Sequence, residues 1–239
     1  MKKLLLIIII ICSLAIRIYG ISQTPQLNAD ESALGYNAYS LIQTGKDEFG
    51  TRWPFVFRSF DDYKPGIYVY LAIPFIEILG LNALAVRLPS LIAAIISIWT
   101  IYYLAQRIFA TSRHKVTIGL ISSLILAIMP WHIQFSRGAW ETQVATTFLL
   151  IGTYFFLLIP KKKKYLFFGL LMYFLALYTY HSMRVLIPLF IFYWSIRYRR
   201  IWFKSPVLTL SALVFSLLAS IPLGLQIFNN TGLSRAQGV

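Results

Sequence analysis

The chain has 239 residues, of which 58% are hydrophobic and only 13% are charged. A water-soluble domain carries about a quarter of its residues as charged side chains, so this composition excludes an ordinary soluble protein and predicts a polytopic membrane protein. The formal net charge of +14 does not indicate nucleic-acid binding, because Lys and Arg cluster in short segments between apolar runs and no RNA- or DNA-binding motif is present.

The first apolar run covers residues 4–21 and follows Lys2 and Lys3. Its length suits a bilayer crossing and it lacks a small-residue cleavage site. It is therefore predicted to be a retained transmembrane helix rather than a cleaved signal peptide. Cys12, the one cysteine of the sequence, lies inside this run and leaves no intrachain disulfide to form.

Seven apolar runs come close to the roughly 17–25 residues that cross a bilayer. They cover residues 4–21, 84–109, 116–131, 142–159, 165–180, 185–196 (with some extension) and 207–228. An eighth run, 66–79, is shorter and contains Glu77. With the N-terminus in the cytoplasm, seven crossings place the lysines of 161–164 inside and all eight Asp and Glu residues outside, as the positive-inside rule favours. Run 66–79 is therefore expected to lie along the outer interface as an amphipathic helix.

This topology predicts an all-α polytopic membrane protein with about seven transmembrane helices. Residues 22–83 form a large first extracytoplasmic loop, and residues 84–228 contain six further spans. Residues 229–239 follow the last span and are expected to begin a longer extracytoplasmic segment. On that expectation the sequence is an N-terminal fragment, and residues 1–239 form one transmembrane module.

Within the first loop, residues 31–44 are expected to form a second amphipathic helix, because apolar side chains recur there at helical spacing. Asp30 is expected as its N-cap and Gly45 as its stop. The aromatic residues between 53 and 63 suit the membrane–water interface. The loop therefore holds its polar groups at the outer face of the membrane.

The neighbouring acids Asp30 and Glu31 are the first group that could carry chemistry. Asp30 is a candidate general base or metal ligand at the membrane face. The alternative is that Asp30 only caps the helix and Glu31 only complements its dipole. A cap and a base are compatible roles, because a carboxylate has several lone pairs to share.

A second group combines Asp61 and Asp62 with Lys64, just before a Pro65-Gly66 turn. Lys64 is a candidate phosphate ligand at the headgroup level, acting as a point charge. The alternative is a solvated turn with an interfacial lysine.

Two other outer loops carry polar residues. Arg137 and Glu141 follow the third span and either pair on a helix start or take part in a site, and Glu141 is the one acid after residue 77. His181 and Arg184 connect the fifth and sixth spans, where Arg184 either meets a phosphate or snorkels to the headgroups.

Arg17 and Arg87 lie near the outer ends of the first two spans. Snorkelling to the headgroups is enough to explain both. No P-loop, dinucleotide fingerprint, zinc spacing or nucleophile elbow is present in the sequence.

Four motifs occur in a fixed order relative to the spans. They are Asn28-Ala29-Asp30-Glu31, Tyr63-Lys64-Pro65-Gly66-Ile67-Tyr68, Ala85-Val86-Arg87-Leu88-Pro89-Ser90 and residues 131–141 with the core Phe135-Ser136-Arg137-Gly138-Ala139. Together they resemble the GT-C class of membrane glycosyltransferases, and within it the protein mannosyltransferases, the aminoarabinose–lipid A transferases and the rhizobial galacturonosyltransferase-type domain. The resemblance covers essentially the whole chain. The chain departs from the family at Lys64-Pro65-Gly66, where Lys-Pro-Pro or His-Pro-Pro is usual.

The resemblance implies a hexosyl- or pentosyltransferase of the cell membrane. Such an enzyme moves a sugar from a polyprenyl-phosphate-linked donor to an acceptor hydroxyl on the extracytoplasmic face, with inversion. It implies Asp30 as the catalytic base with Glu31 beside it, and Lys64, Arg137 and Arg184 as ligands of the donor phosphate. Supporting or acceptor-binding residues would be Arg58, Asp61, Asp62, Glu141 and His181.

The resemblance also bears on cofactors and partners. No metal cofactor is expected, although the acids leave a divalent metal open. The expected partners are the lipid bilayer, the polyprenyl-phosphate sugar and a protein, lipid or polysaccharide acceptor, with no nucleic acid.

Two alternatives stay open. One is a transporter or lipid flippase, whose signature is paired inverted repeats and charged groups at mid-membrane. Here the ionisable groups gather at the outer ends of the spans, and the two halves of the sequence do not resemble each other. The other is an inactive fragment of a glycosyltransferase.

Overall fold

The computed structural model describes residues 2–22, 26–59 and 62–228. The described chain is mostly helical, with 75% helix and 4% strand, which confirms the predominantly helical expectation. Its elements are α1 (Lys2–Ile18), α2 (Ala29–Thr44), β1 (Val56–Ser59), β2 (Asp62–Pro65), α3 (Ile67–Leu79), α4 (Ala83–Ile108), α5 (Lys115–Ile128), α6 (Pro130–Ser136), α7 (Glu141–Leu158), α8 (Tyr165–Leu177), α9 (Met183–Arg197), α10 (Arg199–Lys204) and α11 (Pro206–Phe228).

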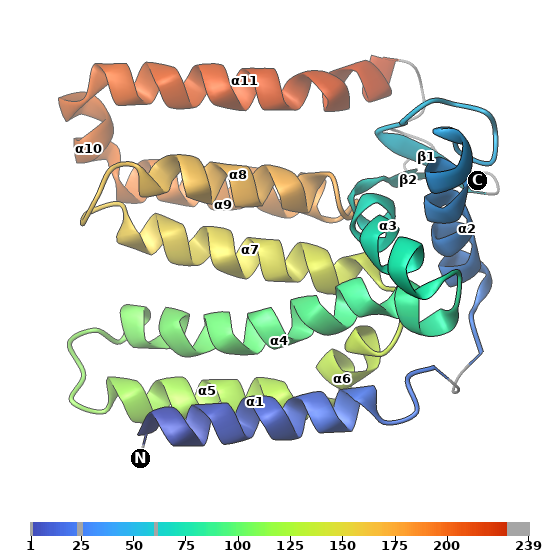
Figure 1. Ribbon diagram of the computed structural model, residues 1–239. Coiled ribbons are helices and arrows are strands. Elements are labelled where there is room, and N and C mark those ends of the chain that lie inside the picture. The colour runs from blue at the N-terminus through green and yellow to red at the C-terminus, as the bar shows by residue number, and fades with distance from the viewer. Residues whose placement is uncertain (1, 23–25, 60–61, 229–239) are drawn as a thin grey trace.

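The long apolar helices run side by side, and the polar first loop folds across one end of them. Figure 1 shows α1, α4, α5, α7, α8, α9 and α11 lying roughly alongside one another, with α2, α3 and the β1–β2 hairpin gathered at one end. Within the described ranges, α4 and α7 are long and apolar enough to cross a membrane, and α5 with α6 meets the same test as a pair bent by 61°. Each apolar run of the sequence therefore folds as a helix.

Glycines bring neighbouring helices of the bundle into close contact. A Cβ at Gly152 on α7 would lie 2.4 Å from the ring of Tyr173 on α8, and one at Gly169 on α8 would lie 2.8 Å from the ring of Phe156. A Cβ at Gly119 on α5 would lie 2.7 Å from the Tyr102 carbonyl oxygen on α4. Such close backbone approach allows van der Waals packing between helices, which is one of the forces that hold helices together in lipid.

Helix α2 begins at Ala29, two residues before its expected start at residue 31. The N-cap is Asn28 rather than Asp30: the Asn28 side chain accepts from the Glu31 N–H, and the Glu31 side chain accepts from the Asn28 N–H, which is a complete capping box. The prediction of Asp30 as the cap is therefore wrong, and the Asp30 side chain is left for other contacts. Gly45 ends the helix in the left-handed region at φ 69°, as expected.

The β1–β2 hairpin was not expected. Val56 pairs with Pro65 and Phe57 with Lys64 in an antiparallel register. The turn into α3 is tight, because a Cβ at Gly66 would lie 2.7 Å from the Phe57 ring and 2.9 Å from the Phe55 carbonyl oxygen. The hairpin therefore fixes Lys64 immediately before α3.

Helix α3 buries one face against the rest of the outer region. Tyr68, Val69, Ala72 and Ile76 are buried in a cluster with residues of α2 and α4, whereas Glu77 is exposed. This one-sided burial agrees with the expected amphipathic helix, which lies at the end of the bundle rather than among its long helices (Figure 1).

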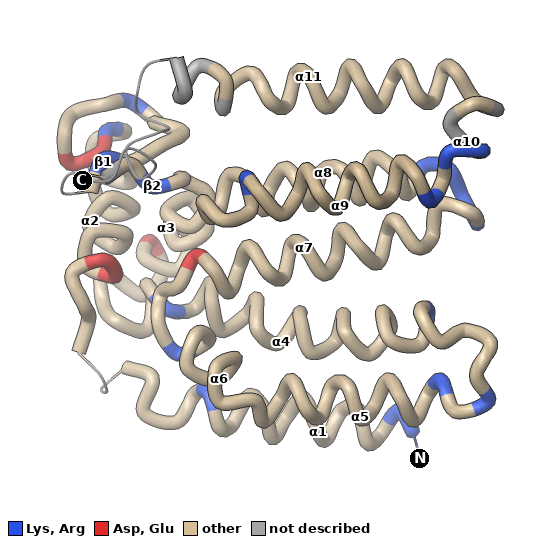
Figure 2. Tube along the Cα trace, turned by 180° about the vertical axis from the view of Figure 1, so that it is seen from behind, with Lys and Arg blue, Asp and Glu red and all other residues tan. Residues whose placement is uncertain are grey.

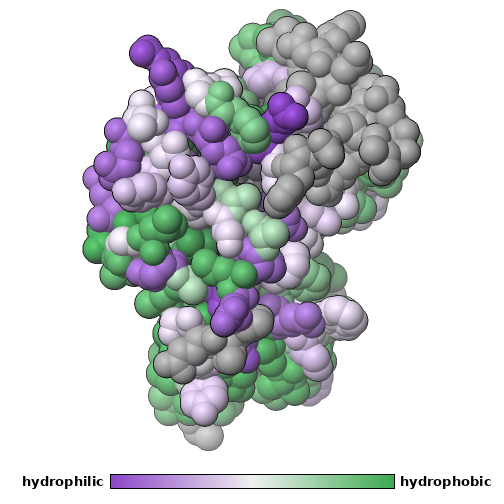
Figure 3. All heavy atoms as spheres, turned by 90° about the vertical axis from the view of Figure 1, so that its right-hand side faces the viewer, coloured by the Kyte–Doolittle hydropathy of each residue, from purple (hydrophilic) through white to green (hydrophobic). Residues whose placement is uncertain are grey.

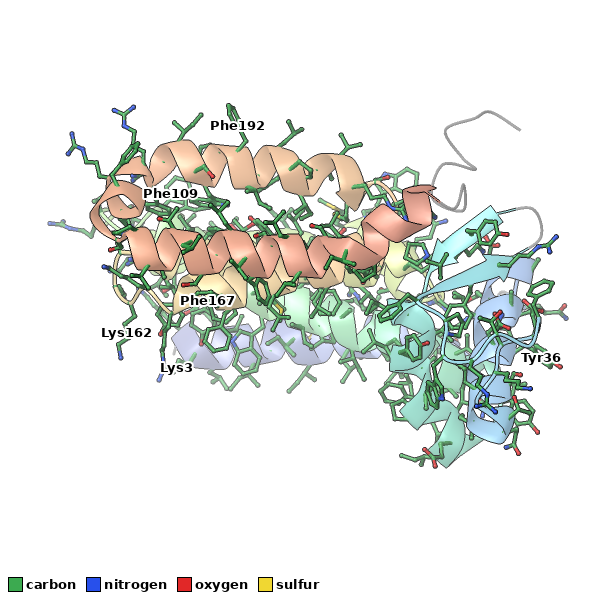
Figure 4. The ribbon with its side chains drawn as sticks, turned by 90° about the horizontal axis from the view of Figure 1, so that it is seen from above. Lys3, Tyr36, Phe109, Lys162, Phe167 and Phe192 are labelled. Atoms are coloured by element: carbon green, nitrogen blue, oxygen red, sulfur yellow. The ribbon has the colours of Figure 1, made fainter. Side chains whose placement is uncertain are left out.

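Acidic residues gather at one end of the bundle, whereas basic residues occur at both. Figure 2 shows the coloured Asp and Glu at the end that carries α2 and α3, where Lys and Arg also occur, and it shows Lys and Arg without acids at the opposite end, around α10 and the loops between the long helices. Seen from above, Lys3 and Lys162 lie at one end and Tyr36 at the other (Figure 4). The end with the acids also shows hydrophilic and hydrophobic residues side by side (Figure 3).

Candidate active site

The acids and bases of the outer region gather around a small polar cavity, which we call the Asp30 cavity. Its volume is about 240 Å³. It is lined by Asp30, Lys64, Pro65, Phe135, Trp140, Glu141, Thr142, Tyr180 and His181. These residues come from the start of α2, from β2, from α6 and the start of α7, and from the turn between α8 and α9, so the fold brings together four separate segments of the sequence.

Asp30 and Lys64 form an ion pair at this cavity. Asp30 lies in the first turn of α2, and its side chain is 51% exposed. Lys64 reaches it from β2 with a side chain that is only 9% exposed. The carboxylate is therefore open to a ligand, while the ammonium group is held in place by its surroundings.

Glu31, the next residue, is held in a different way. Its Oε1 accepts from Arg87 Nε at 2.8 Å and from the Ala139 N–H at 2.8 Å. Its Oε2 accepts from Arg87 Nη2 at 2.8 Å and from the Asn28 N–H at 3.1 Å. Arg87 Nη1 donates to the Ile21 carbonyl at 2.6 Å. The carboxylate is thus saturated, and it ties together the starts of α2 and α4 and the loop before α7.

Hydrogen bonds decide the ionisation of Glu31. Burial by itself raises the pKa of this carboxyl, but the hydrogen bonds from Arg87, Ala139 and Asn28, together with the charge of Arg87, outweigh burial and hold the pKa below its usual value. Glu31 is therefore a carboxylate that stays charged, and its position suits holding Asp30 in place.

The two neighbouring acids face different cavities. Consecutive helix positions are about 100° apart around the axis, so Asp30 and Glu31 cannot point the same way. Glu31 lines a second cavity of about 450 Å³, which we call the arginine cavity. Its lining consists of Asn28, Glu31, Arg87, Pro130, Ile133, Gln134, Arg137, Gly138 and Trp140.

Trp140 lines both cavities and is the residue that they share. Its backbone N–H donates to Ser90 Oγ at 3.1 Å, which fixes it to α4. Gly138 has no room for a side chain, because a Cβ there would lie 2.5 Å from Trp140 Nε1 and 3.3 Å from Glu31 Oε1. The tight loop from Gly138 to Trp140 thus packs against the buried carboxylate.

The structure brings some of the expected site residues together and separates others. Glu141 and His181 line the Asp30 cavity with Lys64, whereas Arg137 lines the arginine cavity. Arg184 lies in the first turn of α9 and is half-buried.

Three expected supporting residues lie elsewhere. Arg58 is exposed on β1, with its guanidinium 5.1 Å from the centre of the Phe49 ring. Asp61 lies outside the described residues, and of Asp62 only the backbone, in β2, is described.

Arg17 and Arg87 do not snorkel, contrary to the expectation, because both side chains are fully buried. Arg17 Nη1 donates to the Ala127 carbonyl at 2.9 Å, and Nη2 donates to His132 Nδ1 at 2.7 Å. The other ring nitrogen of His132 bonds Ser97 Oγ at 2.9 Å. These contacts tie α1 to the bend between α5 and α6, a role that no local sequence signal indicates.

No group of three or more His, Cys, Asp or Glu side chains within the described ranges is placed to hold a metal ion. The chemistry that the described cavities offer is that of carboxylates facing ammonium and guanidinium groups. Such groups move protons and hold anions.

The chain belongs to the dolichyl-phosphate-mannose-protein mannosyltransferase family, whose model matches residues 63–225. It is therefore a membrane glycosyltransferase of the GT-C type, and the donor of that family is a sugar linked to polyprenyl phosphate. The matched region includes Lys64, Arg137 and His181 but begins after Asp30. No curated protein and no solved structure matches the chain.

Proposed function

We propose that the chain transfers a sugar from a polyprenyl-phosphate donor to an acceptor hydroxyl, on the extracytoplasmic face and with inversion at the anomeric carbon. The observation that carries the proposal is the Asp30 cavity. In this cavity the half-exposed Asp30 carboxylate pairs with Lys64, whose side chain is held in place, at the polar end of an apolar helical bundle.

Asp30 is the proposed general base. As the acceptor oxygen attacks the anomeric carbon, its proton passes to the Asp30 carboxylate. The bond between that carbon and the phosphate oxygen breaks, and the electron pair leaves with the polyprenyl phosphate. A half-exposed carboxylate suits this task, because an acceptor can reach it without unfolding α2.

Lys64 is the proposed partner of the departing phosphate. Its ammonium group touches Asp30 in the unliganded protein, so a donor phosphate that draws Lys64 toward itself also frees the carboxylate for the acceptor. Fixed positive charge at a leaving oxygen is worth about 10²–10³ in rate. Arg184 and His181, near the same end of α9, are proposed to complete the phosphate contacts, and Glu141 to orient the acceptor.

We infer that the chain crosses the membrane seven times, through α1, α4, α5, α7, α8, α9 and α11, with the N-terminus in the cytoplasm. The placement of charge in Figure 2 supports this topology, because the end around α10 carries Lys and Arg without acids and so fits the cytoplasmic side under the positive-inside rule. The Asp30 cavity then lies on the opposite face, where lipid-linked sugars take the place of nucleotide sugars.

The experiment that tests the proposal measures release of free polyprenyl phosphate in vesicles. Labelled polyprenyl-phosphate sugars and a mixed acceptor extract are offered to the parent chain and to Asp30→Asn. We expect turnover by the parent and a loss of about 10²–10⁴-fold in the variant, the usual contribution of a general base.

Glu77→Gln is the matched control, since Glu77 is an exposed acid of the same outer region, and it should turn over like the parent. Equal turnover by Asp30→Asn would remove Asp30 as the base. Absence of turnover in the parent with every donor and acceptor offered would contradict the proposed transfer and favour a transport role.

A further inference from the structure

A cleft of about 260 Å³ lies between α9 and α11, toward the end of the bundle that carries α10, and we call it the α9–α11 cleft. Its lining comes from four helices, α7, α8, α9 and α11, and consists of Phe156, Leu166, Leu170, Ile191, Trp194, Ser195, Thr209, Ala212, Leu213 and Ser216. The α7 and α8 residues of this lining are buried, whereas Ser195 and Leu213 are exposed. The cleft therefore opens toward the outside of the bundle.

The cleft offers an apolar surface at the depth of acyl chains. No charged residue lines it, and the hydroxyls of Ser195 and Thr209 donate to carbonyl oxygens four residues earlier, at 2.8 and 3.2 Å. Along α11 the lining runs from Thr209 to Ser216, which at 1.5 Å per residue is about 5–15 Å from the start of the helix at Pro206. In a hydrocarbon core about 30 Å thick, that is the level of the acyl chains of one leaflet.

Two cations lie where this cleft meets α10. The Lys163 ammonium group donates to the hydroxyl of Ser205, the residue between α10 and α11. On the other side of α10, the Arg197 guanidinium lies 5.5 Å from the centre of the Tyr198 ring. That ring stacks on Trp194 of the cleft lining, with the ring centres 5.6 Å apart. Lys163 and Arg197 thus form a basic rim at the shallow end of an apolar cleft.

The positive charge of this rim is not balanced by acids of the same half of the chain. Residues 142–239 contain no Asp or Glu, and Figure 2 shows Lys and Arg without acids around α10. Helices α8 and α11 also begin here, and a helix N-terminus carries a partial charge of about +0.5. The four lysines of 161–164 precede α8 and so repeat the sign of its dipole. An anion at the rim would relieve this repulsion.

We propose that the α9–α11 cleft holds one acyl chain of an anionic phospholipid, whose phosphate lies at the rim formed by Lys163 and Arg197. The apolar cleft and the basic rim stand in the order in which a phospholipid carries its acyl chain and its headgroup. Charge selects the lipid, because basic groups between membrane helices favour headgroups of net negative charge. Under the proposed topology the lipid belongs to the cytoplasmic leaflet, at the end of the bundle away from the Asp30 cavity.

Native mass spectrometry of the purified chain in a neutral detergent tests this site without any transfer reaction. The probes are dioleoyl phosphatidylglycerol, which is anionic, and dioleoyl phosphatidylcholine, which has no net charge. We expect saturable binding of one phosphatidylglycerol and weaker binding of phosphatidylcholine. In Lys163→Gln/Arg197→Gln the affinity for phosphatidylglycerol should fall about 30-fold, the loss expected for two basic residues at an anionic lipid surface. Arg113→Gln/Lys115→Gln removes two exposed cations near the start of α5 and should bind as the parent does.

A second pair of variants tests whether the acyl chain lies in the cleft. Ser195→Trp adds a bulky side chain at an exposed position of the lining and should abolish binding although the basic rim is intact, whereas Ser195→Ala should bind normally. Because a bound lipid stabilises the folded chain, phosphatidylglycerol should also raise the melting temperature of the parent and of Ser195→Ala but not that of Ser195→Trp.

Four results would overturn the inference. They are equal affinity of the parent for the two lipids, an equal loss in Arg113→Gln/Lys115→Gln, parental binding by Ser195→Trp, and a dimer of the parent that Ser195→Trp dissociates, which would assign the cleft to a second copy of the chain. The basic-rim variants decide the question by themselves if Ser195→Trp does not fold. None of these results depends on the Asp30→Asn transfer test.

Discussion

Asp30 and Glu31 are neighbours in one helical turn, and each forms an ion pair, yet the two pairs have very different surroundings. The Asp30 side chain is 51% exposed and pairs with a lysine. The Glu31 side chain is 3% exposed. It accepts from Nε and Nη2 of the fully buried Arg87 guanidinium and from two backbone N–H groups. The same chemical group therefore has one free side in the first pair and none in the second.

This difference assigns different work to the two acids. In the first pair the Asp30 carboxylate is half-exposed, so water or a substrate can replace its contact with Lys64. A buried pair carries a large desolvation penalty that only complete hydrogen bonding offsets, so Glu31 and Arg87 cannot separate without damage to the fold. The comparison predicts that changes to the first pair lower activity and changes to the second lower stability.

The largest expected effect comes from breaking the buried pair. Arg87→Met leaves the Glu31 carboxylate buried without its partner and should lower the free energy of unfolding by about 3–5 kcal/mol. Thermal or denaturant unfolding of the purified chain in micelles measures this loss. The double variant Glu31→Leu/Arg87→Met should regain much of it, because no buried charge is left, and Arg52→Met should be as stable as the parent. A single variant with parental stability would show that the pair is not needed for the fold.

Removal of the partner in the Asp30–Lys64 pair should give the opposite result. Lys64→Gln should lower transfer by about 10²–10³-fold, because a fixed charge at the departing phosphate is lost, but should cost less stability than Arg87→Met, because the Asp30 carboxylate left behind is half-exposed and can be hydrated. Release of polyprenyl phosphate and unfolding are measured on the same preparation, with Lys46→Gln, an exposed lysine of the same region, as the control. A stability loss as large as that of Arg87→Met would make Lys64 structural.

The sequence predicts the helices and the gathering of the acids at one end well, because apolar runs and the charged residues between them are local properties. It also predicts which outer segments supply Lys64, Glu141 and His181, since these lie in loops between runs. It does not predict the burial of Arg17 and Arg87, because an arginine near a helix end has the same local sequence whether it snorkels or meets a partner. Only the tertiary contacts with His132 and Glu31 decide that question.

Two local features carried a signal that the expectations did not use. Asn28 followed three residues later by Glu31 is a capping-box pattern, and it identifies the cap that was assigned to Asp30. Pro130 suits the first turn of a helix, and it marks the start of α6 after the bend. The separation of Arg137 from Lys64 had no such signal, because it depends on which tertiary cavity each side chain lines.

The smallest expected effect is the pH dependence of stability that the buried Glu31–Arg87 pair causes. It tests the charge of Glu31 without a change to Arg87. The pKa of Glu31 in the folded chain lies below its ordinary value of 4.5. A depressed carboxyl pKa stabilises the fold at pH values above the unfolded value, and this stabilisation is lost as the pH falls through the folded value. The stability difference between the parent and Glu31→Gln should therefore be constant above about pH 4.5 and shrink in more acidic solution, whereas Glu77→Gln should follow the parent throughout. A difference that stayed constant into strong acid would mean that the charge of Glu31 does not contribute, and that its hydrogen bonds to Ala139 and Asn28 hold the two segments by themselves.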